Sequence, residues 1–171
     1  MAEERVRAES PSFDAWLASR SLALTRFAYL VTGNRDQGEE ALQAALTSAC
    51  AKWSRVSRAD DPEAYVRRMV VNAHVSWWRS FRRRETPVGD ARDDEHGVDP
   101  ATASVESDRV WRLCGTLPPR QRAAVVLRFY EDLSYSSIAT VLQCSESTAR
   151  GHIHRALGAL RRTIEEERDD G

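Results

Sequence analysis

The sequence predicts an all-α protein with two small helical domains joined by a flexible acidic linker. The second domain contains a helix-turn-helix. Three observations predict this class: apolar residues recur at helical spacing along most of the chain, no stretch of any length alternates as a strand would, and a polar segment containing Pro and Gly interrupts the helical pattern near the middle. The 171 residues suffice for one ordinary domain or two small ones.

The first half of the chain predicts two helices after a disordered tail, residues 1–10. Apolar residues follow a helical period over residues 13–30, and the Thr-Gly-Asn sequence at 32–34 ends that helix. Asp36 can cap a second helix that runs to about Trp53. The first turn of this helix contains several acidic residues. The helix macrodipole favours acids at this end, so they need no further role; alternatively, they form a polar face that binds a protein partner.

A third helix follows a polar loop at residues 57–61. Asp61 is a suitable cap and Pro62 suits the first helical position, so we expect a helix that reaches about Arg84. This helix carries both basic and aromatic residues. Its arginines would attract phosphate, and exposed rings could stack on unpaired bases; alternatively, Trp78 and Phe81 belong to the core and the arginines are merely solvated.

The linker is predicted at residues 86–104, where periodicity is lost among Pro, Gly and acidic residues. A helix over 105–117 follows, then Pro118-Pro119 and a helix to Tyr130. The domains are therefore expected at residues 11–85 and 105–163, with an acidic tail at 164–171.

The C-terminal domain ends in two helices joined by a tight turn. Apolar residues share one face of the segment 134–142, Gln143-Cys144-Ser145 breaks the period, and Ser145 can cap the next helix from Glu146. We expect Ala149, Ile153, Ala156, Leu157 and Leu160 to line its inner side, and Thr148, Arg150, His152 and Arg155 to face outward. Such a pair is a helix-turn-helix, whose second helix enters the major groove of DNA.

The charge distribution agrees with a polyanionic partner. The chain as a whole has a net charge of −1, but residues 62–85 hold six Arg against two Glu, and residues 109–162 hold nine Arg against three acids. Residues 86–108 instead hold one Arg against seven acids. Local charge decides where a nucleic acid docks, so two basic modules flank an acidic connector.

Other classes of protein are disfavoured. Three cysteines without CxxC spacing indicate reduced thiols, and the chain has neither a signal peptide nor an apolar run near the roughly 20 residues of a membrane helix, so a cytoplasmic protein is expected. His152 and His154 lie about 200° apart on a helix and cannot share a metal. Without a nucleophile motif, phosphate loop or paired carboxylates, we expect no enzyme and no cofactor.

The motifs resemble bacterial RNA polymerase sigma factors of the extracytoplasmic-function (ECF) group, in their two-domain minimal form. The C-terminal motif is similar to the domain that binds the promoter −35 element, over residues 117–122, 127–129, 133–135, 138–139, 145–150, 154–157 and 160–161. In the N-terminal half, Gly38–Gln43 resembles the family's clamp-binding helix and Tyr65–Asn72 its −10 helix. Ser76–Arg79 resembles an actinobacterial, SigE-type subgroup.

The resemblance implies a role for each group of residues. The −35 contacts would come from Ser147, Thr148, Arg150, His152, His154 and Arg155. The −10 strand, with one flipped base held by the loop 54–61, would meet Arg55, Ser57, Arg58, Tyr65, Arg68, Asn72, Trp77, Arg79, Arg82 and Arg83. Core polymerase would meet Asp36, Glu39, Glu40 and Gln43.

The resemblance also implies the partners. They are core RNA polymerase (clamp and flap), promoter DNA and an anti-sigma factor, with no membrane contact and a monomeric free state. The family commonly has Asp at Ser76 and larger aliphatic residues at Ala41 and Ala149, and Gly151 costs a helix about 1 kcal/mol relative to Ala. A stand-alone helix-turn-helix regulator and a sigma-like decoy or anti-sigma partner are the alternatives.

Overall fold

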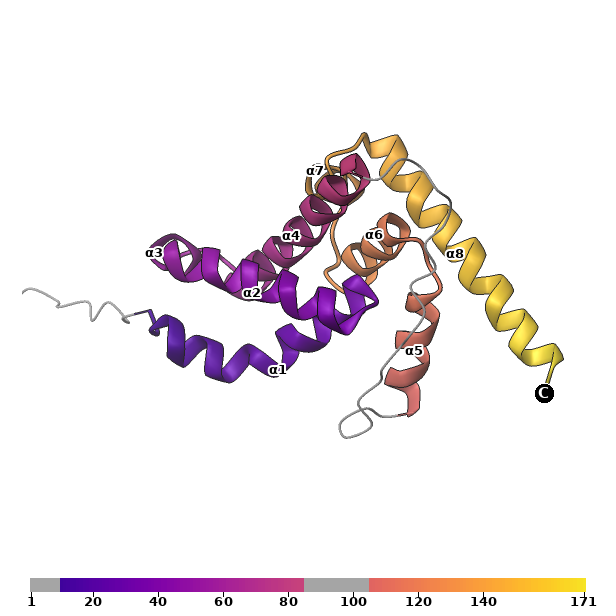
Figure 1. Ribbon diagram of the computed structural model, residues 1–171, viewed down its shortest axis with the longest axis horizontal. Helices are drawn as coiled ribbons and strands as arrows, with labels where there is room; N and C mark the ends of the chain where they lie inside the picture. Colours follow the sequence, from indigo (N-terminus) through magenta and orange to yellow (C-terminus); the bar gives the residue numbers. More distant parts are fainter. Residues whose placement is uncertain (1–9, 85–104) are drawn as a thin grey trace, which may run out of the picture.

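The computed structural model describes residues 10–84 and 105–171, without the side chains of 81–84, 105–108 and 111. Within these ranges the chain is all-α, as predicted, and contains no strand (Figure 1). The helices are α1 (Phe13–Thr32), α2 (Arg35–Ala51), α3 (Trp53–Val56), α4 (Pro62–Arg84), α5 (Val105–Gly115), α6 (Pro119–Phe129), α7 (Tyr135–Leu142) and α8 (Glu146–Asp169). The expected linker 86–104 and the tail before residue 10 lie outside the described residues.

Local signals set most helix ends. The Asp61 carboxylate accepts a hydrogen bond from the amide of Ala64 at 3.0 Å, which confirms the predicted start of α4. Ser145 caps α8 as predicted, accepting from the amide of Thr148 at 3.1 Å. The predicted cap of α2 is wrong: Asn34, and not Asp36, accepts the amide hydrogen bond, because the side chain that caps must precede the first helical residue.

Two further expectations need correction. The second helix was expected to run to about Trp53, but α2 ends at Ala51 and a separate short helix, α3, begins at Trp53. The helix α8 continues to Asp169 and so includes most of the segment expected as an acidic tail (Figure 1). Leu157 was expected on the inner side of α8 but is 39% exposed, since α6 and α7 cover only the face that carries Ala149, Ile153 and Ala156.

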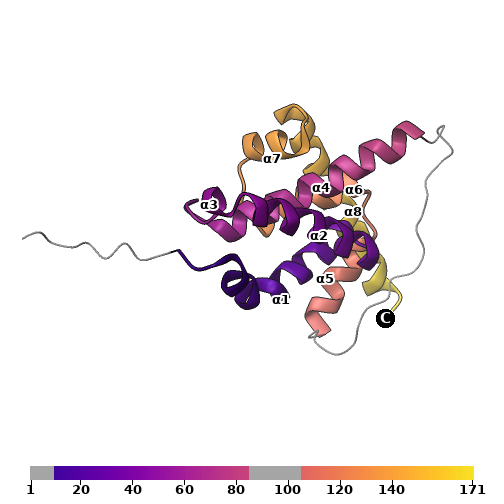
Figure 2. The ribbon, with the colours of Figure 1, turned by 60° about the vertical axis from the view of Figure 1, so that its left-hand side comes forward.

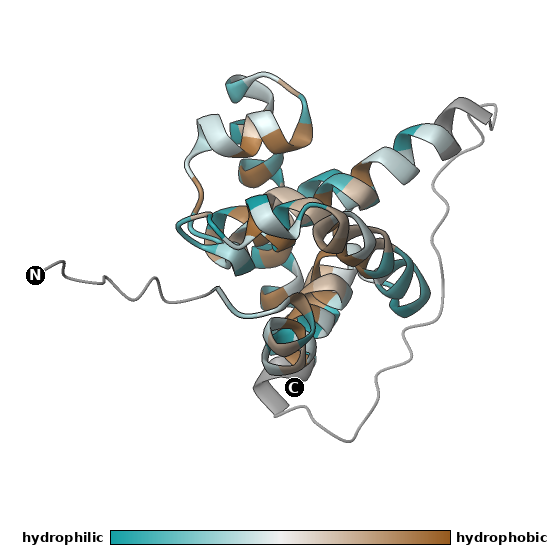
Figure 3. Cartoon of the chain, turned by 90° about the vertical axis from the view of Figure 1, so that its left-hand side faces the viewer, coloured by the Kyte–Doolittle hydropathy of each residue, from teal (hydrophilic) through white to brown (hydrophobic). Residues whose placement is uncertain are grey.

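The two predicted domains pack against each other. In space, α1 contacts α5 and α6, and α4 contacts α7 (Figure 2). One hydrophobic core runs through both halves: Phe27 and Val31 of α1 and Val71 of α4 belong to the same cluster as Leu127 of α6 and Ile138 of α7. The apolar residues gather between the helices while the outer surfaces are polar (Figure 3). Burial of apolar surface on both sides therefore holds the halves together.

Arg122 connects the two halves through backbone carbonyls. Its side chain is buried, and its guanidinium donates to the carbonyls of Cys114 at 2.9 Å, Leu117 at 2.8 Å and Gly115 at 3.2 Å. It also donates to the carbonyl of Thr32, at the end of α1 in the other half. Apart from Leu117, which follows α5, these acceptors lie at the C-terminal ends of α1 and α5, where helix dipoles favour a cation.

Gly33 gives Arg122 its space. Its backbone is left-handed, with φ of 68°, and its amide caps α1 on the carbonyl of Tyr29. A Cβ at this position would collide with the guanidinium of Arg122. Both the conformation and the close approach therefore require glycine.

We expect Gly33→Ala to lower the free energy of unfolding by about 2 kcal/mol or more, because the left-handed backbone alone costs about 1–2 kcal/mol and Arg122 must also move. Urea denaturation followed by circular dichroism measures this. Gly158→Ala is the matched control: its Cβ would meet only Arg162, at 3.7 Å, so this change in mid-helix should raise stability by about 0.5–1 kcal/mol. Equal effects of the two changes would contradict the role of Gly33.

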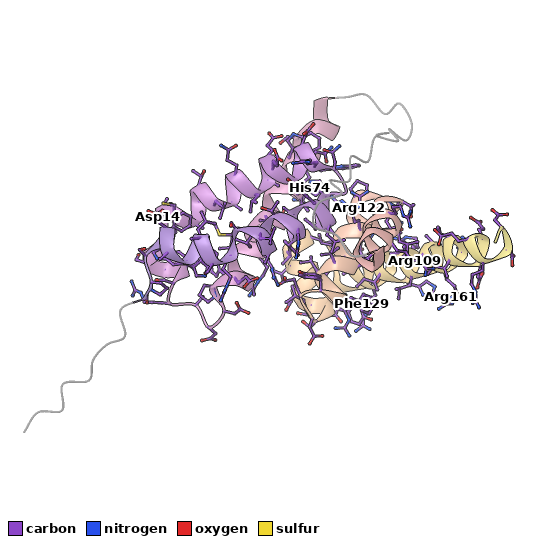
Figure 4. The ribbon with its side chains drawn as sticks, turned by 90° about the horizontal axis from the view of Figure 1, so that it is seen from below. Asp14, His74, Arg109, Arg122, Phe129 and Arg161 are labelled. Carbon is purple, nitrogen blue, oxygen red and sulfur yellow. The ribbon has the colours of Figure 1, made fainter. Side chains whose placement is uncertain are left out.

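His74 on α4 is buried near Arg122 and is 3% exposed (Figure 4). Its Nε2 atom has no hydrogen-bond partner. Burial, and to a lesser extent the positive charge of Arg122, lower the pKa of His74 from 6.5 to about 4. The histidine is therefore neutral in the folded protein.

Stability should depend on pH through His74. Its pKa is lower in the folded chain than in the unfolded chain, so the unfolded chain binds the extra proton; the full stability is present above pH 6.5 and is lost as pH falls toward 4. The loss amounts to about 3 kcal/mol at 1.36 kcal/mol per pKa unit. Urea denaturation from pH 4 to 7 measures it, and His74→Gln should remove this component. An identical pH profile for the variant would show that another group is responsible.

Candidate nucleic-acid interface

The turn between α7 and α8 has helix-turn-helix geometry. Gln143 takes a left-handed conformation with φ of 51°, and the amide of Cys144 donates to the carbonyl of Ala139 at 3.0 Å. Ser134 and Ser145 cap α7 and α8 through their hydroxyl groups. Ile138, Leu142 and Ile153 are buried, so the pair is fixed by a small core and the outer face of α8 is left for a ligand.

Most predicted −35 residues share this outer face. Exposed positions are Ser147, Thr148, Arg150, His154 and Arg155, while His152 is half-buried. Thr148 has its hydroxyl 2.8 Å from that of Ser145, within the capping network. Arg150 forms an ion pair of 2.8 Å with Glu146, one turn earlier. The first turns of α8 therefore present a basic and hydroxyl-bearing surface.

His152 lies within a basic group. Its Nδ1 is 3.4 Å from a guanidinium nitrogen of Arg155, and burial lowers the pKa of its imidazole, an effect to which Arg155 and Arg120 add. A Cβ at the neighbouring Gly151 would lie 3.3 Å from the guanidinium of Arg155, whose exposed side chain can move aside, so this contact does not require glycine.

The predicted −10 residues on α4 divide between two faces. Arg68 and Asn72, one turn apart, are exposed. Tyr65, Trp77 and Arg79 are half-buried, as is the neighbouring Trp78. Trp77 borders a small cavity of about 130 Å³ with His74 and α2, about 180° around the helix axis from Arg68. The structure therefore does not bring Trp77 together with Arg68. The side chains of Phe81, Arg82 and Arg83 lie outside the described residues.

Two arginines of α4 contact the helix-turn-helix domain. Arg67 pairs with Glu131 at 3.0 Å and with Glu63 of its own helix. Arg79 donates to the carbonyl of Leu142 at 3.1 Å and to the side chain of Gln143, at the turn before α8. The helix α4, which is expected to bind the melted strand, therefore also contacts the helix-turn-helix domain.

The segment before α4 is anchored by aromatic residues. Trp53 lies 5.1 Å from Trp16 and 5.4 Å from Phe13, measured between ring centroids, and its indole donates to the carbonyl of Pro11 at 2.9 Å. This packing positions α3 and the turn after it. Arg55 and Arg58 are exposed there and Ser57 is half-buried, so the predicted loop presents two cations beside α4.

The predicted polymerase-binding residues are all exposed on α2, and their i, i+3, i+4, i+7 spacing places them on one face of this helix. Glu39 and Gln43 border a groove of about 730 Å³ between α1 and α2, whose apolar lining includes Leu42 and Leu46. Glu40 borders the small cavity on the side of α4, and Asp36 lies at the start of the helix.

Glu39 belongs to a network at the rim of this groove. Its carboxylate accepts from the Tyr29 hydroxyl at 2.8 Å and from Arg35 at 3.3 Å. The hydrogen bond from Tyr29 lowers the pKa of the Glu39 carboxyl, and the one from Arg35 adds to this. The groove therefore has a charged, ordered edge.

Sequence reasoning missed several residues that the fold brings to these surfaces. Tyr135, at the start of α7, has its ring centroid 4.3 Å from Cζ of Arg150 and 4.8 Å from that of Arg128. Glu131 and Arg122 bridge the two domains. No periodicity could have revealed these contacts, because the partners lie on different helices or in the segments between them. The Leu-Pro-Pro-Arg-Gln-Arg motif marked Arg122 only as part of a resemblance.

Comparisons with known proteins agree with this geometry. A family model described as "Sigma-70, region 4" matches residues 107–160, the part that contains α6, α7 and most of the outer face of α8. The RNA polymerase sigma-E factor of Streptomyces avermitilis is 31% identical over 155 residues, which cover 90% of this chain and 85% of that protein. The sigma-E factor of Streptomyces coelicolor is 30% identical and covers 89% of this chain and 85% of that protein.

Solved structures share the fold. The sigma factor RpoE of Bartonella quintana, in complex with the anti-sigma factor NepR, aligns with a TM-score of 0.62 at 21% identity and covers 90% of this chain and 96% of that one. CnrH, in complex with the cytosolic domain of CnrY, aligns with a TM-score of 0.53 at 20% identity and covers 90% and 88%. No helix in the described ranges is long and apolar enough to cross a membrane.

The sequence matches decide between the two main alternatives. A stand-alone regulator would share only its helix-turn-helix with these relatives, whereas the matches include the N-terminal half and leave only about a tenth of the chain uncovered. The chain therefore belongs to the RNA polymerase sigma factors of the sigma-70 family, in the extracytoplasmic-function group.

Proposed function

We propose that this sigma factor directs core RNA polymerase to promoters through two separate DNA contacts, without catalytic activity of its own. The observation that carries the proposal is that one chain has two exposed faces suited to DNA. One is the basic face of the recognition helix α8, and the other is a face of α4 that carries Arg and Asn. Arg150 represents the first face, and Arg68 with Asn72 the second. Double-stranded and melted DNA require different surfaces, and this chain has one suited to each.

The outer face of α8 is proposed to read the −35 duplex. Ser147, Arg150 and Arg155 are exposed on its first turns, which is the part of a recognition helix that reaches base edges. Arginine can contact a guanine edge with two hydrogen bonds or a phosphate with its charge. Burial and the neighbouring arginines lower the pKa of His152, which favours its uncharged form. Its imidazole would therefore add a hydrogen-bond donor or acceptor without another charge.

The N-terminal half is proposed to hold the melted −10 strand. Arg68 and Asn72 lie one turn apart on α4, and Arg55 and Arg58 are exposed on the segment that precedes this helix. Arginine attracts the strand, while an asparagine amide can both donate to and accept from a base edge. Holding an unstacked base offsets the few kcal/mol that flipping it costs.

The groove between α1 and α2 is proposed to receive the clamp of core polymerase. Its floor is apolar and its rim carries Glu39 and Gln43, a combination that suits an amphipathic helix with basic residues. An anti-sigma factor is proposed as a further partner, because two similar solved structures are complexes with one. The flap of the polymerase would take the C-terminal domain.

The closed packing of the two halves would have to open on the promoter. By their numbering, the −10 and −35 elements are about 25 base pairs apart, or roughly 85 Å at 3.4 Å per base pair. Domains that share one hydrophobic core cannot span that distance. Opening would also release Arg67 and Arg79 from the helix-turn-helix domain, which makes both arginines available to the strand.

We expect Gln43→Ala and Glu40→Ala each to weaken core binding by about fivefold, the effect of one lost hydrogen bond. Titration of labelled protein with core polymerase, read by fluorescence anisotropy, measures this. Glu166→Ala, at an exposed site on α8, is the control and should leave the affinity unchanged.

Run-off transcription on genomic promoter fragments, with and without core, tests the function itself. Tight binding to a duplex operator without core would refute the proposal.

Domain opening predicts a change of distance on binding polymerase. With a donor dye on Ala18→Cys, exposed on α1 outside the groove, and an acceptor on Glu166→Cys, in a chain whose Cys50 is replaced by Ser, energy transfer should fall when core is added. Glu131→Gln should lower it without core, because it removes the partner of Arg67 in the other domain. Glu63→Gln, which removes the partner of Arg67 on its own helix, should leave energy transfer high. Unchanged energy transfer on adding core would rule out opening.

A further inference from the structure

Three side chains from three helices contact one another near the N-terminus of the recognition helix α8. The ring of Tyr135, the first residue of α7, has Cζ of Arg150 4.3 Å from its centroid and Cζ of Arg128 4.8 Å away. Arg128 is itself fixed, because its guanidinium donates to the carbonyl of Leu133 at 2.8 Å. The tyrosine ring is half-buried and thus has little freedom to follow a moving partner.

Arg150 is held at two points although its side chain is 58% exposed. Glu146 binds one end of the guanidinium at 2.8 Å, and the ring of Tyr135 lies beside its central carbon. An arginine free in solvent has many rotamers, and their loss opposes binding. Contacts that already restrict the side chain reduce that loss when a ligand arrives.

We propose that Tyr135 is a positioning residue for the −35 contact: it holds the guanidinium of Arg150 ready to bind a guanine edge. The inference rests on the proposed function of α8. A guanine edge is the ligand favoured here because contact with the ring restricts the orientation of the guanidinium, and two parallel hydrogen bonds to a base require a defined orientation. A phosphate, in contrast, accepts a charge from many directions.

The proposal separates the roles of ring and hydroxyl. Tyr135→Phe keeps the ring and should retain −35 binding, whereas Tyr135→Leu keeps the bulk but removes the π face. We expect Tyr135→Leu to weaken binding to a −35 duplex by roughly two- to fivefold, the size of an exposed cation–π contact. The melting temperature of both variants, measured by circular dichroism, shows whether the domain remains folded.

A double-mutant cycle provides the decisive test. Holoenzyme binding to a promoter identified by run-off transcription is measured for the original chain, Tyr135→Leu, Arg150→Ala and the double variant. If Tyr135 acts through Arg150, Tyr135→Leu has no further effect once Arg150 is alanine. Tyr135→Leu should also reduce the preference for the original −35 sequence over single-base variants, which general loss of stability would not do.

The outcomes distinguish the inference from the function on which it rests. An equal loss from Tyr135→Leu with and without Arg150 would overturn the positioning role but leave the −35 contact in place. A uniform loss across all −35 sequences would overturn the guanine assignment. If Arg150→Ala alone has no effect on promoter binding, the −35 role of Arg150 is wrong and the inference falls with it.

Discussion

The buried guanidinium of Arg122 is the interaction on which the arrangement of the two halves depends. It joins the carbonyl ends of α1 and α5, and Gly33 must lack a side chain to make room for it. A buried cation is tolerated only when its hydrogen bonds are made, so the ends of both helices must stay where they are. The hydrophobic core that runs between the halves then closes around this point.

The same residue type has three different tasks in this chain. Arg122 is structural and buried, Arg67 and Arg79 connect the two halves, and Arg68 and Arg150 face outward on the surfaces proposed for DNA. Burial and partner distinguish these tasks. Glu131 illustrates this, since its buried carboxylate occupies Arg67 as a phosphate would, and burial raises the pKa of that carboxyl while Arg67 opposes the change.

Closed packing and DNA binding compete for part of α4 and leave other surfaces open. Arg79 is engaged by the turn before α8, whereas Arg68, Asn72 and Arg150 remain exposed. The groove between α1 and α2 is also open. A partner could therefore dock on the closed chain first, with separation of the halves following, and a change of about 1.4 kcal/mol in the packing energy would alter the closed-to-open ratio tenfold.

The sequence by itself determined the all-α class, most helix ends, the helix-turn-helix and the family. These follow from local periodicity, caps at Asp61 and Ser145, and motifs contained within short segments. Only the tertiary structure decided that the halves share a core, that Trp77 faces away from Arg68, and that Tyr135 meets Arg150. The reason is physical: an apolar or charged side chain has the same local pattern whatever it contacts, and its partner lies on a distant segment whose position only the packing fixes.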